Sequence, residues 1–536
     1  MESYINRKMN EKMNEKMNEK IIIRYSFLTG ALLFVFFWSV KAQKTDKILS
    51  PAAMEWMKTT NLWRQTSNAA GVLLDDTIRY SELSAAYDAY RGAFRRPEQG
   101  ERENNLTFSA EGAEKLKNTY VWGRFDYMRQ TVGDARYNAS LADPFRGMPY
   151  YVIDENASNW NNQHYDLAFK AAYPASSKLM LGIEGSYRAW IGAKQRDIRV
   201  DSRLYTIDLK PSVVYALAPD HHIGANLHYY NLKEYSEMSI LNVYILQNAY
   251  EMYGLGNARR TSGIDNGRDG VYIGNNAGFG LQYAYSGPLQ VLFTTEWDKK
   301  VEDAQVGQSL PRDEGTVKDV RWVTRLRAFR KGERWSHALT LEYLHRHIDG
   351  IEYVTLLNES TGWESLRSDI RSKYRTQNTA VRYTLFANGA DGYDWLLGGE
   401  VVYSKKKDDY LLPASQMTYE NIIFALRAKK NIRLSARLSK RLLLGVDTRY
   451  NANLSGYYRY GGVYPDYVAV TGLMRSDFEY LTSSFYSVGA SAAYSQRLND
   501  RSGVTAFAKA AFSYTHSGDY HSTNRSRLLI SVGCNF

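Results

Sequence analysis

A single cysteine, Cys534, occurs in a chain of 536 residues. One thiol cannot form an internal disulfide, and it excludes zinc sites that need several cysteines. Beyond residue 42 the chain also lacks any apolar run of 18 residues. A membrane-spanning helix needs about 20 such residues, so this part of the chain is not expected to cross a membrane with helices.

Motifs of common enzyme classes are missing as well. No G-x-S-x-G, H-E-x-x-H or glycine-rich phosphate loop occurs. His345 and His347 share one face of an expected strand, where two imidazoles could hold a metal ion, but no third ligand is evident. We therefore expect no enzyme activity, no metal site and no cofactor, and interpret these histidines as residues of a barrel rim.

Aromatic residues are abundant instead, with 43 Tyr, 11 Trp and 19 Phe against 11 Pro. This composition is expected when each strand has one face in lipid and one in water, although a soluble all-β protein can share it. The net charge of +11 is spread along the chain without a basic block. It indicates a solvated or lumen-lining surface and no nucleic-acid partner. Outer-membrane lipid and anionic lipopolysaccharide are the expected surroundings.

Residues 1–42 form a charged leader followed by an apolar segment. The repeat NEKMNEKMNEK precedes a run of about 16 apolar residues, 25–40, which ends just before Ala42. Basic residues, a short apolar run and a small residue at the cut are typical of a secretory signal peptide. We expect cleavage and export to the cell outer membrane; an uncleaved anchor helix is the alternative.

The rest of the chain alternates apolar and polar residues over long stretches, as in YDLAFKAAY at 165–173. Such runs cover about 10–14 residues, whereas strands of soluble sheets average about 5–6. A tilted strand that crosses the bilayer needs about 9–11 residues. Clear runs lie at 165–173, 179–189, 205–217, 221–233, 277–285, 288–300, 319–330, 334–347, 374–386, 394–405, 419–438, 441–454, 484–497, 503–516 and 526–536, and weaker ones at 77–90, 104–112 and 118–130.

Short and long connections alternate between these runs. Short connections include PASSK at 174–178 and SKR at 439–441. Long connections lie at about 191–202, 234–275, 301–318, 348–373, 406–418, 455–483 and 517–525. A membrane imposes this alternation, with short periplasmic turns and long extracellular loops. The fold class is therefore all-β, a closed antiparallel transmembrane β-barrel of about 14–18 strands, an even number.

The final run has apolar residues at alternate positions, namely Leu528, Ile530, Val532, Cys534 and Phe536. A barrel in lipid must pair its last strand with its first, because unpaired backbone groups are costly there. The pattern Ile530, Val532, Cys534 and Phe536 resembles the signal by which the barrel assembly machinery recognises its substrates. We interpret these four residues as that signal.

The segments LWRQTSNAAG, NTYVWGRFDY and LLISVGCNF resemble a Bacteroidetes-type family of outer-membrane β-barrels of unassigned function, over residues from about 60 to 536. Within the first segment, SNAAG is similar to the Asn-Pro-Ala hatch of fatty-acid transporters, with Ala69 in place of the proline. The resemblance implies 76–536 as the barrel and 43–75 as a periplasmic N-terminal segment or hatch. It also implies a role beside a TonB-dependent receptor in iron or nutrient uptake.

Two groups of residues are candidates for function. The predicted lumen face carries both charges, at Glu184, Arg188, Asp208, Lys210, Glu296, Arg325, Glu342, Arg382, Glu400 and Arg449. Such a face suits a water-filled, porin-like pore or an internal network of ion pairs. A glycine-rich loop carries Tyr457, Tyr458, Tyr460, Tyr464 and Tyr467, a platform on which a flat ligand could stack.

The apolar segment 234–256 could fold inward as a constriction or lie under a partner. We expect a transport function, as a channel or uptake protein for a small ligand or nutrient. A non-conducting barrel that scaffolds a receptor or an assembly complex is the alternative.

Overall fold

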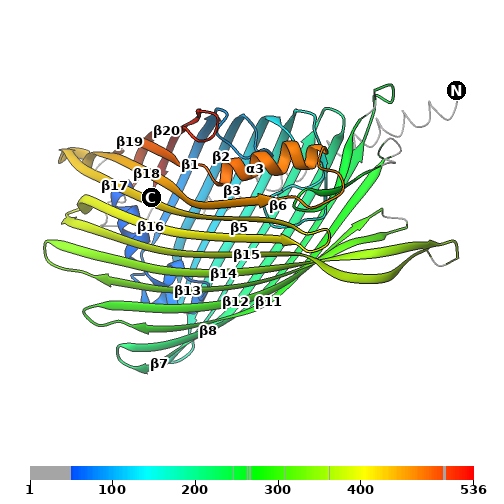
Figure 1. Cartoon of the computed structure of the whole chain (residues 1–536). Coiled ribbons are helices and arrows are strands. Elements are labelled where there is room, and N and C mark those ends of the chain that lie inside the picture. Colours follow the sequence, from blue (N-terminus) through cyan, green and yellow to red (C-terminus); the bar gives the residue numbers. More distant parts are fainter. Residues whose placement is uncertain are drawn as a thin grey trace, which may run out of the picture.

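A computed structural model describes residues 50–245, 247–261, 264, 267–307, 310–360, 362–498 and 503–536. The interpretation of 1–42 as a signal peptide therefore lies outside the described residues. Eighteen strands form one closed antiparallel sheet, a barrel whose strands are strongly tilted (Figure 1). The structure confirms the predicted fold class, at the upper limit of the predicted strand number.

The barrel strands follow one another around the ring in chain order. Their bounds are β1 Tyr80–Arg91, β2 Arg102–Leu116, β3 Thr119–Ala135, β5 Ser158–Pro174, β6 Leu179–Lys194, β7 Arg199–Ala218, β8 His221–Ser239, β11 Arg268–Tyr285, β12 Gln290–Val306, β13 Arg312–Arg330, β14 Trp335–Asn358, β15 Gly362–Gly389, β16 Gly392–Tyr410, β17 Ser415–Ser435, β18 Lys440–Arg459, β19 Phe485–Arg497, β20 Thr505–Ser517 and β21 Thr523–Asn535.

Pairing between β21 and β1 closes the ring. Beyond the last strand residue, the Phe536 amide donates to the Ser81 carbonyl at 2.9 Å, and the Ser81 amide donates back at 2.7 Å. A closed ring leaves no strand edge to be satisfied in lipid. Phe536 therefore belongs to the hydrogen-bonded ladder, while its role with Ile530, Val532 and Cys534 as an assembly signal stays a prediction.

The outside of the barrel is apolar. Leu181, Phe293 and Ile530 are 45%, 40% and 47% exposed, although each belongs to a regular strand. Large apolar side chains exposed at alternate strand positions form the belt that contacts hydrocarbon in a transmembrane barrel. Among the described residues, no helix is long and apolar enough to cross a membrane.

The strands are longer than predicted, and this corrects four of the seven predicted long loops. At 191–202, 301–318, 348–373 and 406–418 the chain stays in strand almost to the turn. The β14–β15 hairpin reaches far beyond its neighbours (Figure 1), with strands of 24 and 28 residues. Beyond the bilayer both faces of a strand meet water, so the alternation that marks a strand in the sequence disappears there.

Shorter elements lie apart from the barrel wall. The N-terminal segment, residues 50–78, holds α2 Pro51–Thr60, η1 Trp63–Gln65 and η2 Ala69–Leu74. A three-stranded sheet comes from two extracellular loops, with β4 Tyr151–Asp154, β9 Ala249–Gly254 and β10 Asn257–Arg260. A third such loop carries η4 Ala469–Met474 and α3 Arg475–Leu481, and η3 Arg437–Ser439 forms a periplasmic turn.

Candidate functional site

The N-terminal segment lies inside the periplasmic half of the barrel. The side-chain amide of Asn68 donates to the Val213 carbonyl of β7 at 3.0 Å and to the Gln282 side chain of β11 at 2.8 Å. The backbone at Ala70 passes directly over Gly182 of β6, where any Cβ would overlap it. The SNAAG sequence is thus seated against the inner wall, because a glycine there lets the two backbones approach closely.

Helix α2 docks against the opposite part of the wall. The Glu55 carboxylate pairs with Lys429 at 2.7 Å and accepts from the Tyr393 hydroxyl at 2.5 Å. Trp56 packs edge-on against Phe386, with ring centroids 4.9 Å apart, and also against Phe329. One aromatic anchor and a few polar contacts hold this helix in the lumen.

A belt of ion pairs runs along the inner wall. Glu184 of β6 pairs with Lys170 of β5 at 3.0 Å and with Lys210 of β7 at 3.5 Å. Lys210 also reaches Asp208 at 3.3 Å, and the Asp208 carboxylate contacts Nε2 of His228 at 3.1 Å. Because these charges neutralise one another, this part of the wall has no electrostatic potential of a single sign.

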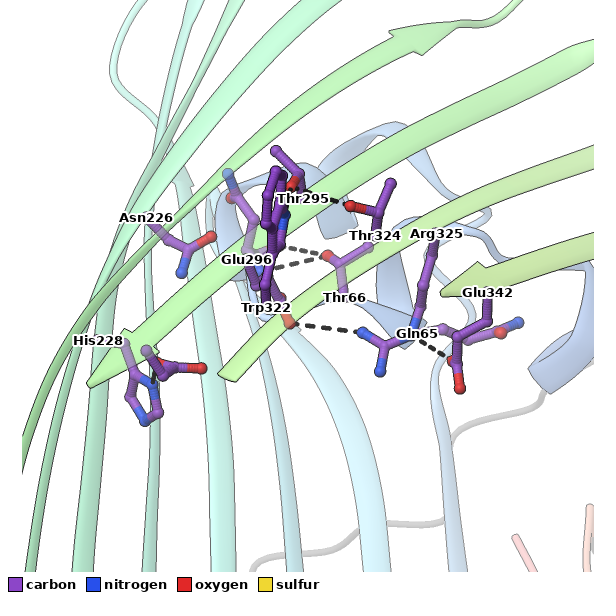
Figure 2. A network of polar contacts seen from close by, with 12 residues as sticks. Gln65, Thr66, Asn226, His228, Thr295, Glu296, Trp322, Thr324, Arg325 and Glu342 are labelled. Atoms are coloured by element: carbon purple, nitrogen blue, oxygen red, sulfur yellow. Dashed lines mark hydrogen bonds and ion pairs between the residues drawn. The ribbon is translucent and has the colours of Figure 1, made fainter. Parts of the chain in front are cut away.

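The belt continues across β12 to β16. Arg325 lies between Glu296 and Glu342, at 3.4 and 2.6 Å (Figure 2). Arg382 continues the row and pairs with Glu400 at 2.6 Å. Eight of the ten predicted lumen residues therefore take part in two rows of ion pairs. The first row contains Glu184, Asp208 and Lys210, and the second contains Glu296, Arg325, Glu342, Arg382 and Glu400.

The other two predicted lumen residues stand apart from this belt. Arg188 pairs with Asp166 at 2.6 Å, and both side chains are largely in solvent. Arg449 is exposed on β18, opposite Ser487 of β19. Within the described part of the chain, Arg449 has no carboxylate partner.

A cavity of about 600 Å³ lies between α2 and the wall strands β13 to β21. Its charged lining comprises six basic and two acidic side chains, namely Lys58, Arg327, Arg382, Arg427, Lys429, Lys509, Glu55 and Glu82. Three of the basic groups have carboxylate partners: Lys58 with Glu111, Arg382 with Glu400 and Lys429 with Glu55. The cavity is therefore electropositive.

The other three basic groups have no ion-pair partner among the described residues. Arg327 is only 7% exposed; its Nη2 donates to the Gln65 carbonyl at 3.3 Å and its Nη1 has no hydrogen-bond acceptor in the described structure. Arg427 donates to the Thr384 hydroxyl at 3.1 Å, and Lys509 lies 4.3 Å from the ring centroid of Phe507. Arg327 and Arg427 were not among the predicted lumen residues. Arg325 and Arg327 are two residues apart and therefore share one face of β13, and this spacing could have indicated Arg327 as a lumen residue.

The extracellular half of the lumen is filled by loops. Arg146, from the loop between β3 and β5, forms buried ion pairs with Glu302 of β12, at 2.8 Å, and with Glu234 of β8. Lys194 of β6 and Asp154 of β4 form another buried pair at 2.6 Å. The loops also contribute most of a large apolar cluster against the inner wall. We call the described parts of 136–157, 240–267 and 460–484 the extracellular cap.

A further contact ties α3 of the cap to the loop between β1 and β2. Arg96 donates to both carboxylate oxygens of Asp477, at 2.7 and 2.8 Å. The neighbouring Glu98 accepts from the Tyr151 hydroxyl at 3.5 Å, while its second carboxylate oxygen is buried without a partner among the described residues. Burial, with a smaller effect of Asp477, raises the pKa of Glu98 to about 7.

The structure does not bring the five predicted loop tyrosines together as one platform. Tyr457 is exposed, whereas Tyr458 packs on Phe478 of α3 with ring centroids 5.8 Å apart. Tyr464 and Tyr467 stack at 4.5 Å, and Tyr467 continues onto Tyr250 of β9 at 4.9 Å. Alternation along β18 sends neighbouring rings to opposite faces, which the count of tyrosines could not reveal.

The Tyr460 ring lies against Gly462 within the same loop. This last member of the predicted set therefore packs on its own loop, and only Tyr464 and Tyr467 stack on each other.

The apolar segment 234–256 divides between two environments. Its end joins the cap through β9, where Met252 is buried, as predicted for an inward fold. Its middle, residues 241–245, is exposed, and Tyr244 reaches 96% exposure. The Asp197 carboxylate accepts the backbone amides of Leu241 and Asn242, at 3.2 and 2.7 Å, and so holds the start of this tip.

No group of three or more potential metal-ligating side chains occurs in the described ranges. His347 contacts Asp349 at 3.0 Å. The absence of enzyme activity and of a cofactor stays a prediction.

The sequence profile of a family of unknown function, DUF6850, matches residues 69–536. No curated protein shows significant sequence similarity to the chain.

Solved structures with a similar course of the chain include two receptors. The ferric preacinetobactin receptor BauA of Acinetobacter baumannii is 10% identical with a TM-score of 0.38, over 86% of this chain and 80% of that one. The alcaligin outer membrane receptor FauA of Bordetella pertussis is 10% identical with a TM-score of 0.38, over 84% and 75%. A FadL homologue of Pseudomonas aeruginosa is 11% identical with a TM-score of 0.30, over 88% and 92%. Similarity at this level supports no inference about a ligand.

Proposed function

This chain belongs to the DUF6850 family of unknown function, and we propose that it is a gated uptake barrel for a small ligand in the cell outer membrane. One observation carries the proposal: a cavity of about 600 Å³ inside a transmembrane barrel, bounded by a segment that is not part of the wall. Ligand pockets typically measure about 300–1,000 Å³. A small nutrient fits such a space.

The proposed gates are the N-terminal segment and the extracellular cap. The described parts of both lie within the lumen, which supports a gated barrel over an open, porin-like pore. Residues 50–78 contact the wall through side chains such as Asn68, Glu55 and Trp56, and they form no strand with it. Displacement of this segment would leave every strand pairing of the barrel intact.

Uptake in such a barrel needs a means of moving the N-terminal segment. Residues 50–75 precede β1 and lie in the periplasmic half of the lumen, so a periplasmic partner could act on them. We propose that the chain works beside a TonB-dependent receptor in iron or nutrient uptake. We also propose that it reaches the membrane through the barrel assembly machinery and is surrounded there by lipopolysaccharide.

A reversible crosslink tests the gate. Ser50 donates to Asp391 in the periplasmic turn between β15 and β16, so Ser50→Cys and Asp391→Cys, in a Cys534→Ser background, place two thiols together. Flux of citrate and of glucose into proteoliposomes is measured under oxidising and reducing conditions. A gated uptake barrel predicts flux that oxidation abolishes and reduction restores. Absence of flux in both states, with a correctly folded barrel, contradicts the proposal.

The exposed tip at 241–245 favours a second candidate function. Four of its side chains, Leu241, Val243, Tyr244 and Ile245, are large, apolar and exposed. Exposed apolar clusters of this kind mark contacts with other proteins. A non-conducting barrel that scaffolds a receptor or an assembly complex would use this tip. It predicts no flux in the crosslinking experiment and loss of a co-purifying membrane protein when Tyr244 and Ile245 are changed to Ser.

A further inference from the structure

We infer that the cavity beside α2 is an anion site, which binds the carboxylate or phosphate group of a small molecule through Arg327, Arg427 and Lys509. This inference rests on the proposed function, because it names the ligand class of the same cavity. It starts from an imbalance of charge: six basic side chains line the cavity against two acidic ones.

The imbalance is concentrated in the three cations that have no ion-pair partner in the described structure. Elsewhere on the inner wall, charged groups such as Arg325 and Lys210 are matched with carboxylates of neighbouring strands. A buried cation without a counter-charge is costly, and Arg327 is buried with Nη1 unpaired. An anionic ligand would supply both the missing charge and the missing hydrogen-bond acceptor.

Strand register makes room for such a ligand. Arg327 of β13 is opposite Thr340 of β14, and Arg427 of β17 is opposite Gly398 of β16. Lys509 of β20 is opposite Ala493 of β19. On this side each cation has a small neighbour, whereas on the other side Arg327 is opposite Leu292, Arg427 is opposite Asp447 and Lys509 is opposite Ser531. The Arg427 side chain lies over Gly398, where any Cβ would overlap it. All three cations line the cavity, as do Thr340 and Ala493.

The chemistry of the three groups sets the ligand class. A guanidinium offers several N–H donors in a plane, which match the oxygens of a carboxylate or phosphate, and an ammonium adds a compact charge. The N-terminal segment adds apolar surface at the same cavity through Met54 of α2 and through Leu62, which follows the helix. We therefore expect an organic anion with an apolar portion in preference to a free inorganic ion.

Titration calorimetry on the full-length barrel in a neutral, phosphate-free detergent tests the site. Citrate represents a soluble carboxylate, glycerol 3-phosphate represents a lipid headgroup, and glucose is the neutral control. We expect binding of at least one of the two anions and none of glucose; the anion that binds identifies the source. Absence of binding by both anions overturns the inference.

Variants locate the site. Arg427→Gln and Lys509→Gln are made as single variants, and both leave the buried Arg327 in place. Each should weaken anion binding about tenfold, because each removes a charged donor. Arg327→Met should weaken it further. Arg188→Gln is the matched control, because Arg188 lies outside the cavity and pairs with Asp166. Equal affinities in all four variants overturn the inference.

The outcome is separable from that of the proposed function. Anion binding without flux in the crosslinking experiment would support the anion site and contradict the uptake function. Flux of citrate and glucose at equal rates, without anion binding, would support the uptake function and contradict the anion site.

Discussion

His228 and Asp298 lie on strands that are not neighbours, and their side chains meet across the strand between them. Gly278 of β11 is opposite His228 of β8 on one side and opposite Asp298 of β12 on the other. Any Cβ at Gly278 would overlap the Asp298 carboxylate. The missing side chain is therefore what lets Nδ1 of His228 contact Asp298 and lets the ion-pair belt cross β11.

Gly278→Ala should break this contact. The added methyl group would push Asp298 off His228, and overpacking of this kind costs about 1–3 kcal/mol. The measurement is the free energy of unfolding in urea from lipid vesicles. Gly123→Ala is the control, because a Cβ there would meet only the Ala168 carbonyl oxygen, at 3.9 Å. Equal stabilities of the two variants would contradict the bridging role of Gly278.

Arg146→Met should loosen the extracellular cap. Without the guanidinium, Glu234 and Glu302 would be two buried carboxylates without their shared cation. Breaking a buried ion pair costs about 3–5 kcal/mol. Residues 136–157 should become sensitive to added protease, and the variant should show new current steps in planar bilayers. Arg188→Met removes the largely exposed pair with Asp166, where about 0–1 kcal/mol is expected, and should do neither.

Trp56→Ala should weaken the docking of α2. The indole is partly buried and packs edge-on against Phe386 and Phe329. Removing a fully buried tryptophan costs about 3–5 kcal/mol, so a smaller cost is expected here. Amide hydrogens of 51–60 should exchange faster by about two orders of magnitude, while those of the wall strands should not change. Lys58→Ala on the same helix loses a partly exposed ion pair with Glu111, and little change is expected.

Glu98 should make the contact between α3 and the β1–β2 loop dependent on pH. Its pKa is raised to about 7, first by burial and then by Asp477, while Arg96 lowers it. The stabilisation from the protonated carboxyl is full below the unfolded value of about 4.5 and is lost as pH rises through about 7. Hydrogen exchange of 92–101, corrected for the intrinsic rate, should accelerate about tenfold from pH 5 to pH 8.

Glu98→Gln keeps the shape of the side chain and removes its titration. The corrected exchange rates of this variant should be the same at both pH values. A pH dependence that persists in the variant would assign the effect to another group.

The barrel was predictable from the sequence because a bilayer forces a period of two on each strand that crosses it. Leu181, Phe293 and Ile530 lie in three of the runs predicted as transmembrane strands, and all three side chains are exposed on the barrel. The three weaker runs are β1, β2 and β3. On the outward face of β1 and β2, alanines such as Ala85 and Ala110 alternate with large exposed side chains such as Tyr87 and Leu106. Strand ends beyond the bilayer, as in β14 and β15, carry no such constraint and were interpreted as loops.

The interior was less predictable because its contacts join distant parts of the chain. Period two placed Arg325 on the lumen face, but its pairing with Glu296 and Glu342 follows from the register of three strands. Arg327 lies on the same face of β13 but has no such partner. This difference depends on how Gln65 and α2 pack against the wall, which the sequence does not show. The prediction of a tyrosine platform was wrong for a similar reason, because composition does not show which rings turn inward.

The seam between β1 and β21 raises two routes by which the barrel can close during biogenesis. Residues 50–78 come immediately before β1, yet they lie within the cylinder that β1 and β21 complete. If the seam closes first, these residues must enter the closed ring through its periplasmic end, which is the reverse of the movement that the proposed gate requires. If Asn68 instead binds β6, β7 and β11 before the sheet closes, the barrel forms around residues 50–78. The segment would then guide the curvature of the sheet, and the pairing of β21 with β1 would enclose it.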